Sequence, residues 1–279
     1  MSAELHDGIH SWSLPIAVTF VPIAIALVYF SGWFRLRKAL PNLVAAWQLA
    51  AFVGGVCVAW TAVGSPLSTL DHRMLTAHMA QHLLLMTVAA PLILLAAPAI
   101  TLLHGLPQHL VLSALRPLAR SRGAHQLGGI VTHPVFCWLA STAVVIGWHI
   151  PALFEWGMRS ASWHEVEHAS FLAAGLLFWW PVIQPWPSLA EWPQWRIPLY
   201  LFVATLPCDA LSAFLTFCNR VVYPHYLFAH RLFDTSALAD QESAGALMWV
   251  WVTLIYLVPA AIVTIQMLSP QGISKVEAL

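Results

Sequence analysis

The chain has 279 residues, of which 59% are hydrophobic and only 9% are charged, and its mean hydropathy is +0.74. This composition excludes an ordinary soluble globular domain and indicates a protein embedded in the lipid bilayer. Twelve Lys and Arg residues balance twelve Asp and Glu residues, so the charge does not point to nucleic acid as a partner.

Seven apolar segments follow one another along the chain, and each approaches the roughly 20 residues that a helix needs to cross a bilayer. They occupy about residues 14–34, 43–64, 75–97, 131–150, 163–183, 197–217 and 245–267. Pro, Gly and charged residues occupy the segments between them. We therefore predict an all-α, polytopic membrane protein, in which residues 1–279 form a single membrane domain with a bundle of about seven transmembrane helices.

The first apolar segment is expected to be a retained helix, and two forms are possible for the third. The first follows an acidic start that contains Glu4 and Asp7, which favours a retained helix over a signal peptide. The third contains Pro91 and is followed by Pro98. Both a continuous helix and an interrupted, re-entrant pair are compatible with prolines at these positions.

Basic residues predict the orientation, because cytoplasmic loops accumulate Lys and Arg near helix ends. If the N-terminus lies outside, the inner side carries Arg35, Arg37, Lys38, Arg116, Arg120, Arg122, Arg196 and Lys275. The outer side then carries only Arg73, Arg159, Arg220 and Arg231. This imbalance predicts an N-terminus outside and a C-terminus inside.

A stripe of histidine and methionine residues in the third segment is the most unusual chemical feature of the sequence. Histidines inside a bilayer are costly unless they find polar partners, so their presence there points to function. Met74, His78, His82 and Met86 follow one another at intervals of four residues. This spacing places all four side chains on one face of a helix that begins at the outer surface.

Three further histidines are expected at the same membrane level. His149 ends the fourth segment, which runs outward, and His164 and His168 share one face of the helix that begins the fifth. Neighbouring polar side chains often hydrogen-bond to ligand imidazoles and orient them. Candidates for that supporting role are Glu167, Asp240 and His72.

The mixture of ligand types favours copper as the metal. Imidazole suits copper, zinc, iron and nickel, whereas thioether sulfur is soft and selects Cu(I). The predicted copper site comprises His78, His82, His149, His164, His168, Met74 and Met86. A competing interpretation is that the methionines only fill space between helices and that the histidines are hydrogen-bonded packing residues.

Two other features bear on function. Residues 164–168, His-Glu-Val-Glu-His, match the HExxH pattern of zinc metalloproteases, in which two histidines bind zinc and the glutamate is the general base. The match is weak, because it spans five residues in a chain that has 14 histidines. Asp209, a carboxylate in the sixth segment, fits a helix-packing hydrogen bond better than a metal ligand or a proton relay.

Several spaced motifs, from the second segment to the seventh, together resemble a known family. They are His78-Met79-Ala80-Gln81-His82-Leu83-Leu84, Ala90-Pro91-Leu92, Ala97-Pro98, His133-Pro134, Trp148-His149-Ile150-Pro151-Ala152-Leu153-Phe154, His164-Glu165-Val166-Glu167-His168, Phe178-Trp179-Trp180-Pro181-Val182, Asp240-Gln241, Gly245 and Met248-Trp249. In this order they resemble the CtaG-type membrane proteins required for the assembly of haem-copper cytochrome c oxidases. One departure is Ala97, which stands where the family has a glycine before Pro98.

The resemblance implies a factor that delivers or inserts copper into the catalytic subunit of a haem-copper oxidase. It also implies a multi-pass protein of the bacterial inner membrane that is not an enzyme. The oxidase subunit would be its partner, and a periplasmic copper donor would supply the metal. A methionine beside the histidines would give such a carrier a soft, exchangeable ligand.

Three alternatives remain open from the sequence. A b-type haem protein would use imidazoles from two facing helices as axial ligands. An intramembrane zinc metalloprotease would use the HExxH pattern at His164 to His168. A metal-free scaffold would hold oxidase subunits together while its histidines pair with carboxylates across helices.

Overall fold

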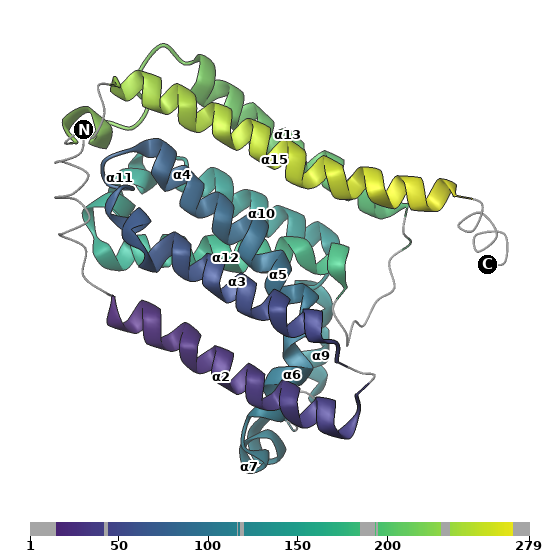
Figure 1. Cartoon of the computed structure of the whole chain (residues 1–279). Coiled ribbons are helices and arrows are strands. Elements are labelled where there is room, and N and C mark those ends of the chain that lie inside the picture. Colours follow the sequence, from purple (N-terminus) through teal and green to yellow (C-terminus); the bar gives the residue numbers. More distant parts are fainter. Residues whose placement is uncertain are drawn as a thin grey trace.

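The computed structural model describes residues 15–269, except residues 42–43, 116, 118–119, 185–192, 194 and 230–234. In this part of the chain the backbone forms helices and no strand (Figure 1). The long helices are α2 (Ile16–Ala39), α3 (Ala46–Gly64), α10 (Pro134–Trp148), α12 (Ala161–Ile183), α13 (Arg196–Phe217) and α15 (Ala237–Leu268). A segmented helix consists of α4 (Leu75–Leu83), η2 (Leu84–Ala89) and α5 (Ala90–Leu95). The shorter elements are η1 (Pro66–Thr69), α6 (Pro98–Gly105), α7 (Gln108–Leu110), η3 (Val111–Leu115), α9 (Arg122–Val131), α11 (Pro151–Arg159) and α14 (His225–Phe228).

Six helices among the described residues are long and apolar enough to cross a membrane, which confirms the predicted all-α, polytopic architecture. They cover Val18–Ala39, Ala46–Thr69, Leu75–Leu95, Ala161–Ile183, Arg196–Phe217 and Ala237–Leu268. A seventh crossing results if α9 and α10 form one span, although the two helices are bent by 64° at the break between them. α15 begins at Ala237, well before residue 245, where the apolar segment of the sequence starts.

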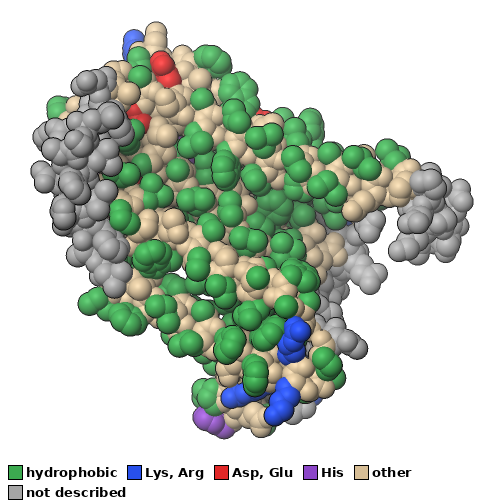
Figure 2. Space-filling view, viewed as in Figure 1, with side chains coloured by type: hydrophobic (Ala, Val, Ile, Leu, Met, Phe, Trp, Pro, Cys, Tyr) green, Lys and Arg blue, Asp and Glu red, His purple; other side chains and the backbone are tan. Residues whose placement is uncertain are grey.

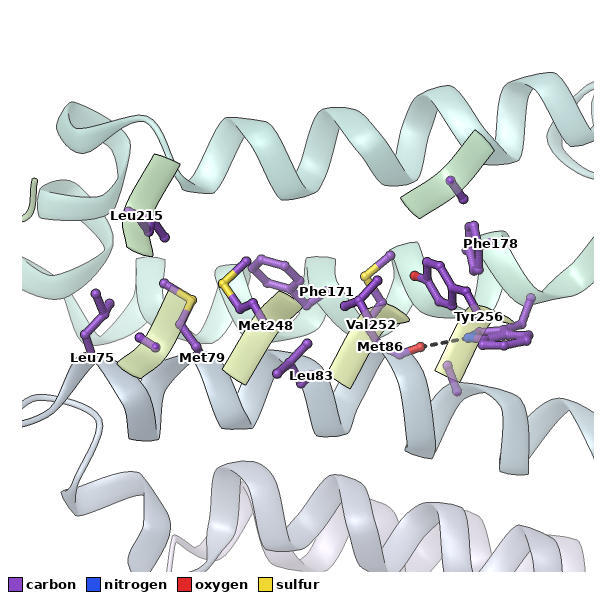
Figure 3. Packing of buried hydrophobic residues seen from close by; sticks show 14 of the residues in the cluster. Leu75, Met79, Leu83, Met86, Phe171, Phe178, Leu215, Met248, Val252 and Tyr256 are labelled. Carbon is purple, nitrogen blue, oxygen red and sulfur yellow. Dashed lines mark hydrogen bonds between the residues drawn. The ribbon is translucent and has the colours of Figure 1, made fainter. Parts of the chain in front are cut away.

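The third apolar segment is one continuous helix as far as Leu95, so the re-entrant alternative does not hold. Its middle part, η2, is a π-helical turn in which the N–H of Ala90 bonds to the carbonyl of Leu85. The next residue, Pro91, has no N–H, so the carbonyl of Met86 loses its partner in the helix. The indole N–H of Trp179 on α12 donates to that carbonyl at 3.1 Å, as the dashed line in Figure 3 shows.

The helix that ends at Leu95 is followed by a residue in the left-handed region. Ala97 has a φ of 47°, and Pro98 then opens α6. A side chain with a Cβ is disfavoured in this conformation, whereas glycine adopts it freely. The backbone therefore gives a physical reason for the glycine expected at this position from the family resemblance.

The helices form three groups that lie side by side in Figure 1. In the centre, α12 packs against α10 and against η2 and α5, while α3 packs against η2 and α5 from another side. The pair α13 and α15 covers one flank, with α15 in contact with α4. On the opposite flank, α2 packs against α3 and α6. The helix from residue 75 to residue 95 is thus enclosed by neighbours, and it is the most buried of the candidate spans.

Close approach of α12 to the π-helical turn depends on Gly175. A Cβ at this position would lie 2.6 Å from the carbonyl oxygen of Met86, which is far inside van der Waals contact. Small residues at such crossings let two backbones pack directly. The contact places the first half of α12 against α4, where the polar residues of both helices meet.

The surface has the distribution expected of a protein immersed in lipid. Apolar side chains cover most of the face seen in Figure 2, and basic residues gather at one end, near α6. There Arg37 and Lys38 lie in the last turn of α2, and Arg35 donates to the carbonyl of His104 at 3.1 Å. The orientation stays a prediction, and three of the residues on which it rests lie outside the described part of the chain. They are Arg116, Arg231 and Lys275.

Candidate metal centre

Two histidines and one glutamate converge in the interface between α4 and α12. The Nε2 atoms of His78 and His82 lie 2.8 Å apart, and each lies 3.3 Å from Oε1 of Glu167. The exposed fractions of the three residues are 0%, 5% and 1%. We call His78, His82 and Glu167 the inner triad. Such a group is costly within a membrane unless it shares protons or binds a cation.

The inner triad retains unused polar atoms. The Nδ1 atoms of both histidines and Oε2 of Glu167 are buried and have no hydrogen-bond partner among the described residues. Buried polar atoms without a partner are rare in folded proteins, and each one calls for an explanation such as a water molecule or an ion. The donor set of two imidazoles and one carboxylate is one that binds transition-metal ions.

Aromatic rings from α11 and α12 pack against the histidines of the inner triad. The ring of Phe154 lies 5.1 Å from that of His78, edge to face, and the ring of Phe171 lies 3.9 Å from that of His82. Both phenylalanines are buried. Because they exclude water and restrict the imidazoles, they keep the triad in one arrangement.

Asp240 fixes the helix that carries the two histidines. Its carboxylate accepts the N–H of Leu75 at 2.6 Å and that of Thr76 at 3.2 Å, and the Thr76 hydroxyl at 2.6 Å. These contacts satisfy donors at the N-terminus of α4, which no carbonyl of the helix can reach. Asp240 therefore caps α4, and among the described residues its carboxylate has no hydrogen bond to a histidine. The role expected from the sequence, orienting an imidazole, stays a prediction.

His164 and His168, one turn apart on α12, extend the cluster around the inner triad. The ring of His164 stacks on that of His78 with 5.6 Å between centroids, and it lies 4.3 Å from that of His168. The ring of His168 lies 5.4 Å from that of His82. The Nε2 atom of His168 is 3.4 Å from the amide oxygen of Gln81. Four of the five histidines expected at the site therefore lie together.

A second cluster lies between the inner triad and the surface. Asp71, His72 and His164 each offer one ligand atom within 4.8 Å of the others, and we call them the outer cluster. The Nε2 atoms of His72 and His164 lie 3.8 Å and 3.7 Å from the two carboxylate oxygens of Asp71. Asp71 is 0% exposed, and neither of its carboxylate oxygens has a hydrogen-bond partner among the described residues.

Burial governs the chemistry of Asp71. It raises the pKa of the Asp71 carboxyl above its ordinary value, although the imidazoles of His72 and His78 act in the opposite direction. The backbone carbonyl of Asp71 accepts the hydroxyl of Tyr226 at 2.8 Å. Burial raises the pKa of this hydroxyl well above its ordinary value, so Tyr226 stays a proton donor. The carboxylate is thus held in a place where a charge without a cation is costly.

A small cavity of about 50 Å³ lies deeper in the bundle, next to the inner triad. His82 and His149 line it together with Met79, Met86, Met248 and Cys208. Figure 3 shows Met79, Met86 and Met248 in the layer between the helices that carry them. The Nδ1–H of His149 donates to the carbonyl of Val145, 2.7 Å away, and the buried Nε2 of His149 has no hydrogen-bond partner among the described residues. Soft sulfur atoms therefore line the same cavity as two imidazoles.

The two methionines expected as ligands lie at different places. Met86 lines the cavity with His82, whereas Met74 is the N-cap residue of α4 and is not among the residues that line the cavity. Asp71 was not among the site residues expected from the sequence. The only signal available was a carboxylate directly before His72, in the short connection between two apolar segments.

The HExxH pattern is not arranged as in a zinc metalloprotease. Its glutamate, Glu165, is exposed, while Glu167 points into the inner triad. His164 lies beside Asp71 rather than sharing the inner triad with Glu167. A general base on the exposed face of α12 is not placed to activate water on a metal held by these histidines.

The inner pair of histidines is also too close to sandwich a haem. Axial imidazoles hold their ring nitrogens about 4 Å apart, on opposite sides of the porphyrin plane. The Nε2 atoms of His78 and His82 are separated by 2.8 Å and come from the same helix. These two histidines therefore favour a single ion or a shared proton.

Comparison with known proteins gives one family and three relatives. The sequence model of the family described as cytochrome c oxidase caa3 assembly factor matches residues 27–269. The uncharacterized proteins Mb0105 of Mycobacterium bovis and MT0111 of Mycobacterium tuberculosis are each 26% identical over 244 residues, and ML1998 of Mycobacterium leprae is 24% identical over 257. Each alignment covers 85% of this chain but only 36% of the relative, so the chain spans about a third of their length. No solved structure matches.

Proposed function

Since this chain belongs to the cytochrome c oxidase caa3 assembly factor family, we propose that it holds copper at the inner triad and delivers it to the catalytic subunit of a haem-copper oxidase. Copper is then the cargo of the protein. The observation that carries the proposal is the buried convergence of His78, His82 and Glu167, with ligand atoms 2.8–3.3 Å apart.

The ligand set supports copper over harder cations. Two imidazoles and a carboxylate bind Cu, Zn and Fe, whereas the thioethers of Met79, Met86 and Met248 in the adjacent cavity select Cu(I). A carrier must capture the ion and must also release it by ligand exchange. The sulfur atoms that line the cavity with His82 are alternative ligands to which the ion can move from the triad.

The location of the triad supports delivery on the outer side of the membrane. In Figure 1, α4 and the start of α15, which carry His78, His82 and Asp240, lie at one end of the bundle, and the last turns of α2, which carry the basic residues, lie at the other. Because basic residues mark the cytoplasmic side, the triad faces outward in a bacterial plasma membrane. A periplasmic copper donor and the oxidase subunit reach it from there. The protein transfers an ion by ligand exchange and is not an enzyme.

Metal and haem content test the proposal directly. The detergent-purified chain is analysed for copper and zinc and by visible absorbance, alongside the variant His78→Ala/His82→Ala. The matched control is His109→Ala/His125→Ala, which removes two exposed histidines outside the cluster. The expected result is that the triad variant holds less copper than wild type and the control, which hold equal amounts.

The other outcomes contradict the proposal in distinct ways. Haem absorbance that depends on the histidines would indicate a redox protein. Zinc in place of copper would indicate a different cargo. A protein that takes up no added Cu(I), yet is still needed for a copper-loaded oxidase in cells, would indicate a metal-free scaffold.

A further inference from the structure

We propose that Asp71, His72 and His164 form a second copper site, which receives the ion at the surface and loads the inner triad. This inference rests on the proposed function. It adds a second binding site and a direction of movement that the inner triad alone does not require. The ion keeps its oxidation state and moves by ligand exchange.

The distances between the polar atoms of the outer cluster are close to the distances between ligand atoms around a bound metal ion. A transition-metal ion about 2.0–2.2 Å from its ligands holds those ligand atoms about 3–3.6 Å from one another. The carboxylate oxygens of Asp71 lie 3.7 Å and 3.8 Å from the Nε2 atoms of His164 and His72. These distances exceed a hydrogen bond, so the three groups face a common point without bonding to one another.

Asp71 provides an independent indication of a ligand. Both carboxylate oxygens are buried and have no hydrogen-bond partner among the described residues. Nε2 of His164 is likewise buried and without a hydrogen-bond partner there. A purely structural carboxylate in such a place would accept hydrogen bonds from backbone or side-chain donors, as Asp240 does. A cation between Asp71 and His164 satisfies these atoms together.

Exposure falls stepwise from the surface toward the inner triad. The side chains of His72, His164 and His78 are 47%, 11% and 1% exposed. The ring of His164 lies 5.2 Å from that of His72 and 5.6 Å from that of His78. His164 is therefore placed between a ligand that meets solvent and a ligand that does not.

Hydrogen bonds from α14 hold His72 and Asp71 in position. The Nε2 atom of His225 lies 3.1 Å from the carbonyl oxygen of His72, and Tyr226 donates to the carbonyl of Asp71. Both partners come from α14, while His164 comes from the first turn of α12. The outer cluster is thus built by segments distant in sequence and is not a run of neighbouring polar residues.

Transfer between the sites is balanced in bonds and charge. Bonds from the ion to Asp71 and His72 break as bonds to His78 and His82 form, with His164 between the two sets. The imidazole that carries its proton on Nε2 shifts that proton to its unpartnered Nδ1 as the ion arrives, so both Nε2 lone pairs face the ion and no proton is lost.

The test compares stoichiometry and rate in the full-length protein in detergent. Cu(I) is supplied anaerobically from a chromophoric chelator, and uptake is followed for wild type, Asp71→Asn/His72→Ala and His78→Ala/His82→Ala. Glu165→Gln/His109→Ala is a charge-matched control, because it removes one carboxylate charge and one imidazole at exposed positions. The single variant His72→Ala guards against misfolding, since its side chain is exposed.

Wild type and control are expected to bind two ions, and each double variant one. The outer variants should also load the inner triad at least about tenfold more slowly than wild type, with unchanged affinity at equilibrium. One ion in wild type, unaffected in amount and rate by the outer variants, would overturn this inference while leaving the proposed function intact. If no protein took up Cu(I), the proposed function itself would fail.

Discussion

The Nε2 atoms of His78 and His82 lie 2.8 Å apart, so one ring donates an N–H hydrogen bond to the other. A neutral imidazole carries a single N–H, and the pair can place only one proton between these two atoms. Glu167 Oε1 lies 3.3 Å from both. The site therefore concentrates negative charge and nitrogen lone pairs at one buried point, which is where we propose that the metal ion binds.

Removal of the negative charge from the inner triad should weaken metal binding without dismantling the fold. We expect Glu167→Gln to lower the affinity for Cu(I) by about 10- to 100-fold, because the amide keeps the shape but loses the charge. Competition with a chromophoric chelator measures this. Glu165→Gln, at an exposed position on the same helix, is the control and should leave the affinity unchanged. Equal affinities in both variants would exclude Glu167 as a ligand.

The cap on α4 gives a prediction that separates stability from metal binding. Asp240→Ala leaves the N–H groups of Leu75 and Thr76 without their acceptor and should cost about 1–2 kcal/mol. We expect a lower Tm in detergent, with the copper stoichiometry unchanged. Glu242→Ala, at an exposed position on the same helix, should change neither quantity. A loss of copper at unchanged Tm would instead support the ligand-orienting role expected from the sequence.

The close crossing at Gly175 should tolerate no side chain. We expect Gly175→Ala to lower the free energy of unfolding by about 1–3 kcal/mol, because the new Cβ would lie 2.6 Å from a backbone oxygen of η2. Gly128→Ala is the matched control, since a Cβ there would meet nothing within 4 Å. Thermal unfolding in detergent measures both variants. Equal stabilities would mean that α12 and η2 are not packed this closely.

Ala97 offers a route to a more stable protein. Its φ of 47° is strained for alanine, so Ala97→Gly should stabilise the protein by about 0.5–1 kcal/mol. Ala96→Gly is the contrasting control, because Ala96 is buried and has right-handed dihedral angles. There the glycine should lower the Tm. A decrease in Tm for both variants would show that the left-handed residue is not under strain.

Hydrophobic segments were sufficient to predict the six helices that are long and apolar enough to cross a membrane, because membrane spans are long and uniformly apolar. The composite helix from residue 75 to residue 95 shows the limit of that reasoning. Its prolines suggested a possible break, yet Trp179 supplies the hydrogen bond that Pro91 cannot. A partner 93 residues away along the chain cannot be inferred from local pattern.

The candidate site was predicted in part for a similar reason. Spacing by four residues places His78 above His82, and His164 above His168, wherever the helices lie. The roles of the acidic residues depend on tertiary packing, so Asp240 was assigned to imidazoles although it caps a helix. Asp71 was not identified, because only the folded chain brings it beside His164.

The π-helical turn of η2 sets the rotational phase between the two halves of its helix. A π turn accommodates one residue more than an α turn, which corresponds to about 100° of rotation around the axis. Deletion of one residue between Leu84 and Ala89 would restore a regular helix and swing the two histidines of α4 away from Glu167, if α5 stayed in place. Insertions and deletions are therefore far less tolerable here than substitutions, and the spacing between His82 and Pro91 is itself a determinant of the site.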